Sequence, residues 1–331
     1  MQEIKEQLKS LYMESFEDDG ESYADFFLSS YYNGENALIK KEGQEIISAL
    51  YIIDKTLFLS GKTYSFPFLS AVATRARLRG KRLIENVISD AFAKLLFEKT
   101  PYCALYPFSH RYYEKYGFTV INGVDTKKVQ ALSKEQALNC YLNKNPSAST
   151  LLKVYNNYAK DFDGFLVRDL PRFKQLLQDW EKSGNTVRLI TCNEKNCYVS
   201  YGGGEIEECV GDLSLLGAVE DIVGLEYGRP FGVEPYNMAR VVDVCAALSR
   251  KGYIEDGKFA FYLKDGFFPQ NEGVYILKVN KGKGSGEKIS KDNTLGAQEV
   301  TIEELTKVLL CGGALGGFEV ENVEFFCLDK Y

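Results

Sequence analysis

The chain has 331 residues, which is the length of two or three domains of ordinary size. Its composition, with 45% hydrophobic, 26% charged and 13% aromatic residues, is typical of a folded globular protein and excludes a disordered chain. The 40 basic residues against 46 acidic ones give a net charge of −6, which disfavours a general nucleic-acid binder.

Histidine and cysteine usage narrows the chemistry further. The single histidine, His110, cannot build a His-rich metal site, and any Ser-His-Asp triad would have to include it. The eight cysteines form no CxxC pair, so we predict no metal and interpret them as reduced, buried side chains. The charged N-terminal stretch does not resemble a signal peptide, and no apolar run approaches the roughly 20 residues that cross a bilayer. We therefore expect a cytoplasmic protein with no membrane partner.

The first third of the chain alternates between helical and extended patterns. Apolar spacing predicts helices up to about residue 32, two strands within 37–53, and a further strand over 64–72. Pro67 lies inside that last segment and cannot donate a ladder hydrogen bond, so the strand should carry a bulge or an unpaired stretch. Adjacent apolar pairs every four residues from Leu83 to Leu96 predict a long amphipathic helix.

The rest of the chain continues the mixed pattern. A strand over 102–108 precedes a short helix that Gly117 ends. Residues 142–150 have the composition of a linker, and two helices and two strands follow it. Thr301 and Glu304 form a capping-box pattern at the start of a late helix.

A basic turn stands out in this acidic chain. The segment TRARLRGKR places five basic side chains just before the long helix. A helix N-terminus has unpaired N–H groups and a partial positive charge, so this turn is a natural seat for a pyrophosphate. A solvated basic turn is the alternative, and a nucleic-acid patch has no support from the net charge.

Two motifs in sequence order resemble the core of the GNAT acetyltransferase superfamily. They are VATRARLRGKRL and, beyond the amphipathic helix, ALYPFSHRYYEKYGF, and the likeness covers about residues 1–125. The whole chain is similar to Eis-like acetyltransferases, since MARVVDVCAAL and TIEELTKVLLCG resemble their sterol-carrier-protein-like third domain. The resemblance implies an α+β fold: a GNAT-type mixed central sheet flanked by helices, a second GNAT-like unit, and a C-terminal sterol-carrier-like α/β domain. The implied domains are 1–145 with the coenzyme site, 146–232 without one, and 233–331.

The same resemblance implies a coenzyme site. Backbone groups of the bulged strand would hold the pantetheine arm, and the turn after it would wrap the pyrophosphate. The family's R-x-x-G-x-G/A motif reads Arg79-x-x-Arg82-x-Ile84 here, without either small residue. A shifted frame, Arg77-x-x-Gly80-x-Arg82, keeps one glycine but spoils the spacing from the preceding strand, so we prefer the first frame. The implied contacts are Val72, Ala73, Thr74, Arg79, Gly80, Lys81, Arg82, Leu83, Ile84 and Ser109.

Catalytic and substrate roles also follow from the resemblance. Tyr113 matches the position of a tyrosine that protonates the departing thiolate, a task that suits a phenol. The terminal carboxylate of Tyr331 is implied to help accept the proton of the amine. Asp18 and Glu21 are candidates to attract a cationic amine, although they are equally typical of a solvated turn.

Taken together, these features predict an acetyl-CoA-dependent N-acetyltransferase that moves an acetyl group directly to a primary amine of a small molecule or peptide. The family also implies a homo-oligomer, and nucleic acid is not an expected partner. The alternative is a catalytically inactive GNAT-like protein that binds an apolar ligand or a protein partner through its C-terminal domain.

Overall fold

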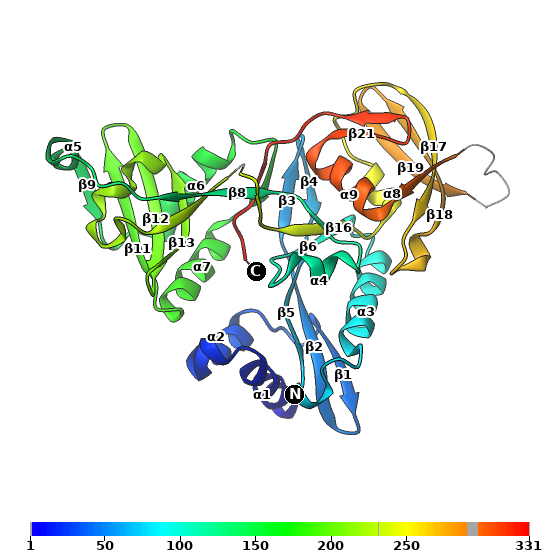
Figure 1. Ribbon diagram of the computed structural model, residues 1–331, viewed down its shortest axis with the longest axis horizontal. Coiled ribbons are helices and arrows are strands. Elements are labelled where there is room, and N and C mark those ends of the chain that lie inside the picture. Colours follow the sequence, from blue (N-terminus) through cyan, green and yellow to red (C-terminus); the bar gives the residue numbers. More distant parts are fainter. Residues whose placement is uncertain (1, 231, 290–296, 331) are drawn as a thin grey trace.

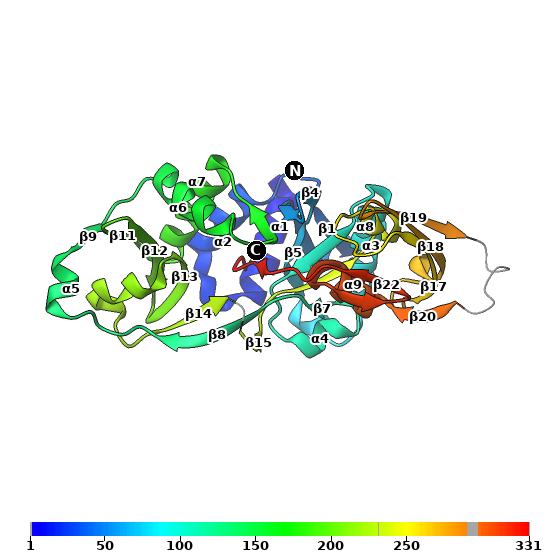
Figure 2. The ribbon, with the colours of Figure 1, turned by 90° about the horizontal axis from the view of Figure 1, so that it is seen from above.

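The computed structural model describes residues 2–230, 232–289 and 297–330. Figure 1 shows three lobes that meet where the chain ends: the N-terminal lobe in blue and cyan, a green second lobe, and an orange third lobe. Seen from above in Figure 2, the second and third lobes lie at opposite ends of an elongated molecule.

A mixed sheet organises the first lobe. In the described residues its strand order is β1-β2-β5-β6-β16-β7. β16 comes from far along the chain, yet it pairs antiparallel with both β6 and β7. The domain boundary predicted at 232/233 remains a prediction, and this strand pairing crosses it. The bounds are β1 (Ala37–Glu42), β2 (Glu45–Ile53), β5 (Phe68–Thr74), β6 (Tyr102–Leu105), β7 (Thr119–Val120) and β16 (Met238–Val241).

Helices cover both faces of this sheet because β2 is apolar on both sides. Its alternate residues Ala49 and Tyr51 pack with the helices near the N-terminus, whereas Leu50 and Ile52 pack with the long helix. The predicted helix over 83–97 is confirmed. The helices of this lobe are α1 (Gln2–Ser15), α2 (Gly20–Ser30), α3 (Leu83–Phe97) and α4 (His110–Glu114).

The predicted single strand over 64–72 is wrong, because the structure divides it at Phe66 and Pro67. The proline has no N–H to give to a ladder, and the chain changes sheets there. The part before it joins a sheet of order β23-β10-β3-β4, which draws on three distant stretches of the chain. Its strands are β3 (Thr56–Leu59), β4 (Lys62–Ser65), β10 (Gly164–Val167) and β23 (Phe325–Phe326).

The second lobe contains a sheet of order β13-β12-β11-β9 backed by two helices, and a ribbon of order β14-β8-β15. Phe173, Trp180 and Tyr198 are central to its buried core. The elements are α5 (Lys134–Leu138), α6 (Ala148–Ala159), α7 (Leu170–Lys182), β8 (Gly123–Lys128), β9 (Cys140–Asn143), β11 (Thr186–Cys192), β12 (Lys195–Gly202), β13 (Glu205–Gly211), β14 (Glu226–Pro230) and β15 (Glu234–Pro235).

The third lobe packs a sheet of order β19-β18-β17-β20 against two helices. The capping box predicted at Thr301 and Glu304 is confirmed at the start of its longer helix. The elements are α8 (Val244–Leu248), α9 (Ile302–Cys311), β17 (Gly257–Lys264), β18 (Gly273–Asn280), β19 (Lys283–Ile289), β20 (Gln298–Thr301), β21 (Gly313–Leu315) and β22 (Phe318–Val320).

Buried polar contacts join the lobes. Asp179 on α7 accepts hydrogen bonds from Tyr23, at 2.7 Å, and from Tyr31 of the first lobe. The fully buried Arg240 of β16 forms an ion pair with Asp265 of the third lobe. Removing one partner of such a buried pair is costly, so these contacts hold the lobes in one arrangement.

Candidate functional site

The neighbouring strands β5 and β6 separate after a single point of contact. They run parallel and are in register only at Phe68 and Ala104, where the Ala104 N–H also donates to the Pro67 carbonyl at 2.9 Å. From Leu69 to Thr74, the edge of β5 that faces β6 has no strand partner in the part of the chain that the structure describes. The expected splay is present, and it leaves backbone groups free to bind a ligand.

A bulge in β5 accompanies this splay. Leu50 of β2 lies opposite two residues, Ala71 and Val72, and Ala71 has the left-handed φ of 46°. The sequence predicted a bulge or an unpaired stretch: Phe66 and Pro67 lie outside any strand, and a bulge also occurs four residues after Pro67. Such a bulge bends the strand and changes the direction of the residues that follow. Beside it the Ser70 hydroxyl is buried without a hydrogen-bond partner in the described residues, which fits a ligand-binding edge.

Three of the five basic side chains in the predicted phosphate turn have partners within the protein. Arg75 lies 2.7 Å from Glu14, and Arg77 lies 2.5 Å from Glu45. Arg79 donates to the backbone of β5 at 3.2 Å. These contacts hold the turn on the first lobe. The three arginines are therefore already engaged within the protein and are less available to a ligand.

Arg82 holds an unusual backbone conformation at the start of α3. It is the residue before the first helical one and has φ 59°, in the left-handed region that glycine adopts most easily. The frame Arg79-x-x-Arg82-x-Ile84 puts Arg82 where the GNAT motif has its first glycine, so the backbone agrees with that frame. Gly80 is also left-handed, with φ 81° and open space around its Cα.

The remaining cations of the turn are free. Lys81 and Arg82 are exposed, and neither has an ion-pair partner among the described residues. The first amides of α3, at Leu83 and Ile84, are N–H groups that a helix leaves unpaired. Two cations and a helix start therefore face solvent together, which suits a pyrophosphate.

Tyr113 lies on α4 and belongs to the same buried apolar cluster as Leu69 of β5. Its ring contacts Phe108 and Phe118, with centroids 5.6 and 6.1 Å away, and the residue is 4% exposed. Burial, with smaller effects of Tyr112 and Tyr116, raises the pKa of its phenol well above the usual range. The phenol therefore stays protonated at neutral pH, as a general acid must. Ser109 lies at the N-cap position of the same helix.

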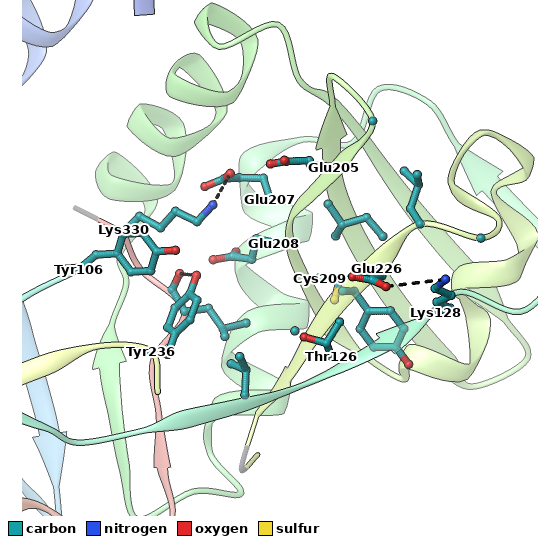
Figure 3. Close-up of a pocket in the computed structure, with 18 residues that line it drawn as sticks. Tyr106, Thr126, Lys128, Glu205, Glu207, Glu208, Cys209, Glu226, Tyr236 and Lys330 are labelled. Carbon is teal, nitrogen blue, oxygen red and sulfur yellow. Dashed lines mark hydrogen bonds and ion pairs between the residues drawn. The ribbon is translucent and has the colours of Figure 1, made fainter. Parts of the chain in front are cut away.

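A cavity of about 530 Å³ opens beside the first lobe, between the second lobe and the last residues of the chain. Tyr106, which directly follows β6, is part of its wall, and Tyr236 packs on that ring with centroids 4.9 Å apart. Figure 3 shows these tyrosines with Lys330 at one end and Glu226 with Lys128 at the other. Its glutamates outnumber its lysines: Glu205, Glu207, Glu208 and Glu226 against Lys128 and Lys330.

Ion pairs neutralise this acidic wall only in part. Lys330 lies 2.8 Å from Glu207, whereas Lys128 lies 3.8 Å from Glu226 at the exposed end. Glu205 has no ion-pair partner within the described ranges. The cavity therefore offers negative charge to a cationic ligand.

A buried ionic network fixes the chain end beside the cavity. Asp329 lies 2.5 Å from both Lys55 and Arg168, and Arg168 also pairs with Glu208 at 2.6 Å. Although burial alone would raise it, Arg168 and Lys55 hold the pKa of Asp329 well below its usual range. Through Lys55, the network joins the loop before β3 to the cavity wall, and it brings Lys330 into the cavity. Tyr331 lies outside the described residues, so its predicted role remains a prediction.

The acidic residues that the sequence offered for an amine do not line this cavity. Asp18 and Glu21 are exposed near α2, and Glu21 forms an ion pair with Lys9 at 2.8 Å. The sequence analysis missed the acidic wall, although the segment EIEE at 205–208 is a local signal for it.

Among the described residues we find no cluster of three or more metal-ligating side chains, and no helix that is long and apolar enough to cross a membrane.

Comparison with family models identifies the two ends of the chain. A model of the acetyltransferase (GNAT) domain matches residues 2–121, and a model of the sterol carrier protein domain matches residues 244–317. The chain thus carries a GNAT acetyltransferase domain followed by a sterol carrier protein domain. No curated protein matches it significantly.

Solved structures show the same fold over nearly the whole chain. Eis1 from Mycobacterium abscessus is 14% identical with a TM-score of 0.75, and the match covers 100% of this chain and 98% of that one. A probable N-acyltransferase from Enterococcus faecalis is 17% identical, with a TM-score of 0.75 and coverage of 94% and 88%. A GCN5-related N-acetyltransferase from Anabaena variabilis is 18% identical, with a TM-score of 0.73 and coverage of 93% and 88%. The chain shares its fold with Eis1, and the two matched domains stand in the predicted order.

Proposed function

We propose that the protein is an acetyl-CoA-dependent N-acetyltransferase that transfers an acetyl group directly to a primary amine. One observation carries the proposal: the free edge of β5 lies beside two exposed cations, Lys81 and Arg82, at the start of α3, within the acetyltransferase domain. The edge suits an amide-containing arm, and the cations suit a pyrophosphate.

In this proposal acetyl-CoA supplies the thioester, and the protein positions it. Backbone groups of Val72, Ala73 and Thr74 hold the pantetheine arm, while Lys81, Arg82 and the first amides of α3 hold the pyrophosphate. Ser109, at the start of α4, contacts the coenzyme close to Tyr113. Tyr113 gives its proton to the departing thiolate, and burial favours that role because it keeps the phenol protonated. The amine attacks in its neutral form, after its ammonium group has released a proton to water, and the tetrahedral intermediate loses its second N–H proton as the phenol is restored.

The acceptor amine enters through the acidic cavity. Its volume suits a small molecule or the side chain of a peptide. Glu205, Glu207 and Glu226 attract the cationic form, and Tyr106 links the cavity to the end of β6. The geometry therefore favours an acceptor that carries positive charge, with transfer driven by proximity.

Calorimetric titration with acetyl-CoA tests the coenzyme site. We expect binding in the micromolar range, about tenfold weaker in Lys81→Ala because one charge-assisted contact to phosphate is lost. Arg77→Ala is the matched control: it removes a cation of the same turn that is already paired with Glu45, so affinity should not change.

A negative result in either experiment, binding or transfer, would contradict a stated part of the proposal. No binding by the wild-type chain, restored by Arg82→Gly, would show that one side chain closes the turn and would favour the inactive, apolar-ligand-binding alternative. Where acetyl-CoA binds, release of the coenzyme thiol in the presence of a panel of mono- and polyamines measures transfer. Binding without release for any amine would contradict the enzymatic role.

A further inference from the structure

Two cysteines face each other in the second lobe, away from the proposed coenzyme site. Cys140 on β9 is the register partner of Cys192 on β11, and both are half-buried. Both pack against the same apolar cluster, which contains Ile190 and Val199. Because side chains alternate along a strand, the two thiols point to one face of the sheet.

This geometry is that of two residues that can be bridged. Opposed residues of an antiparallel pair have Cα atoms about 4.5 or 5.5 Å apart, depending on the kind of pair. Disulfides span Cα separations of about 4.4–6.8 Å, so neither strand has to move. Burial and a hydrogen bond with the Cys192 thiol raise the pKa of Cys140, which agrees with sulfur atoms in contact.

A lysine completes the row across three strands. Lys195 on β12 is the register partner of Cys192, on the side away from Cys140. Its ammonium group pairs with Asp212 at 2.7 Å and stays close enough to Cys192 for their charges to interact. Because the pKa of Cys140 is raised, the Cys140 thiol stays protonated, and we assign Cys192 as the attacking cysteine.

We propose that Cys140 and Cys192 form a reversible disulfide that joins the edge strand β9 to the sheet. With glutathione disulfide as oxidant, the Cys192 thiolate attacks one of its sulfurs and releases one glutathione thiolate. The Cys140 thiolate then attacks the Cys192 sulfur of the mixed disulfide and releases the second. Two cysteine thiols are oxidised to one disulfide, and one glutathione disulfide is reduced to two thiols.

The link would act on a weakly held part of the lobe. β9 is a four-residue edge strand that follows the short helix α5, where Leu138 is 85% exposed. The same stretch leads from β8, whose Val124, Thr126 and Lys128 line the acidic cavity. Oxidation would therefore restrain the segment between the cavity and the edge of the sheet.

The test oxidises the full-length native protein with glutathione disulfide, blocks free thiols by alkylation and maps the peptides by mass spectrometry. We expect one cross-link, between Cys140 and Cys192, which dithiothreitol reverses. The oxidised protein should melt a few °C higher, because the cross-link restricts the unfolded chain. Amide hydrogen exchange in β9 should slow.

Two variants make the outcome unambiguous. Cys140→Ser should leave a glutathione adduct on Cys192, because the resolving thiol is gone. Cys245→Ser, which removes a half-buried cysteine of the third lobe, should still form the cross-link. Cys140 and Cys192 that stay free, remain as separate adducts, link two copies of the chain, or join only in denaturant would each overturn the proposal.

Discussion

The basic turn at the start of α3 and the acidic cavity of the second lobe are opposite in charge and in construction. The turn is one continuous stretch, residues 75–84, on the surface of the first lobe. The cavity wall combines Tyr106, which follows β6, with residues from β8, β13, β14 and the chain end. A ligand site made by one segment depends on local conformation, whereas one made by many segments depends on how the lobes are held.

The two cations that the turn offers to a ligand are exposed, whereas a buried residue holds the cavity wall in place. Lys81 and Arg82 are exposed, so changing them should alter binding without unfolding the protein. The cavity wall depends on Arg168, which is buried between Glu208 and Asp329. Changes there should act first on stability and only then on the ligand.

The largest effect is expected for Arg168→Met. It leaves Glu208 buried without its cation and removes one of the cations beside Asp329, and breaking such a network costs about 3–5 kcal/mol. Urea denaturation should show this loss in the free energy of unfolding. Lys195→Met is the control, because its pair with Asp212 is exposed and solvent screens it, so its loss should change stability little. Equal stability of both variants would mean that the network does not hold the wall.

The same network predicts how stability changes with pH. Arg168 and Lys55 depress the folded-state pKa of Asp329, so its contribution is complete above the unfolded pKa, near 3.9, and is lost as the pH falls below it. Asp329→Asn should be less stable at neutral pH and should lose less stability between about pH 5 and pH 2. Thermal melts across that range measure the slope, with Asp18→Asn as the exposed control. An unchanged slope in Asp329→Asn would be the contrary result.

Tyr113→Phe tests the proposed proton donor. Loss of a general acid lowers kcat by about a hundredfold or more, while acetyl-CoA affinity should hold because the ring is retained. The matched control is Tyr112→Phe, which removes the neighbouring hydroxyl on the same helix. Full turnover by Tyr113→Phe would exclude the proton-donor role.

The two sites also differ in how far the sequence predicts them. The turn, the long helix and the position of Tyr113 follow from neighbouring residues, so local patterns suffice. The bulge does not, because Ala71 is left-handed only through its pairing with β2. Met238–Val241 is a short stretch, apolar except for Arg240, that would fit many sheets, and its pairing with β6 depends on the whole fold. In the sequence, Glu205 and Glu207 are typical of surface residues of a strand. They line a cavity only in the folded protein, where residues at the chain end form part of its wall.

Glu205→Gln should weaken the capture of a cationic amine. The variant removes a wall carboxylate that is exposed and has no ion-pair partner in the described part of the chain, so we expect the KM of a polyamine to rise about threefold with kcat unchanged. High salt should erase the difference, since it screens exposed charges. Glu21→Gln, outside the cavity, serves as control. A KM that rises equally in both variants would mean that the amine does not use the cavity.

Arg82→Gly distinguishes the two ways in which the turn can hold the pyrophosphate. Glycine relieves the left-handed strain at φ 59°, so the free protein should gain up to about 1 kcal/mol in urea denaturation. Lys81→Gly, without a positive φ, should bring no gain. If the backbone amides alone hold the pyrophosphate, acetyl-CoA affinity should survive in Arg82→Gly. If the side chain grips the phosphates, the variant should be more stable yet bind about tenfold more weakly, as one lost charge-assisted contact predicts.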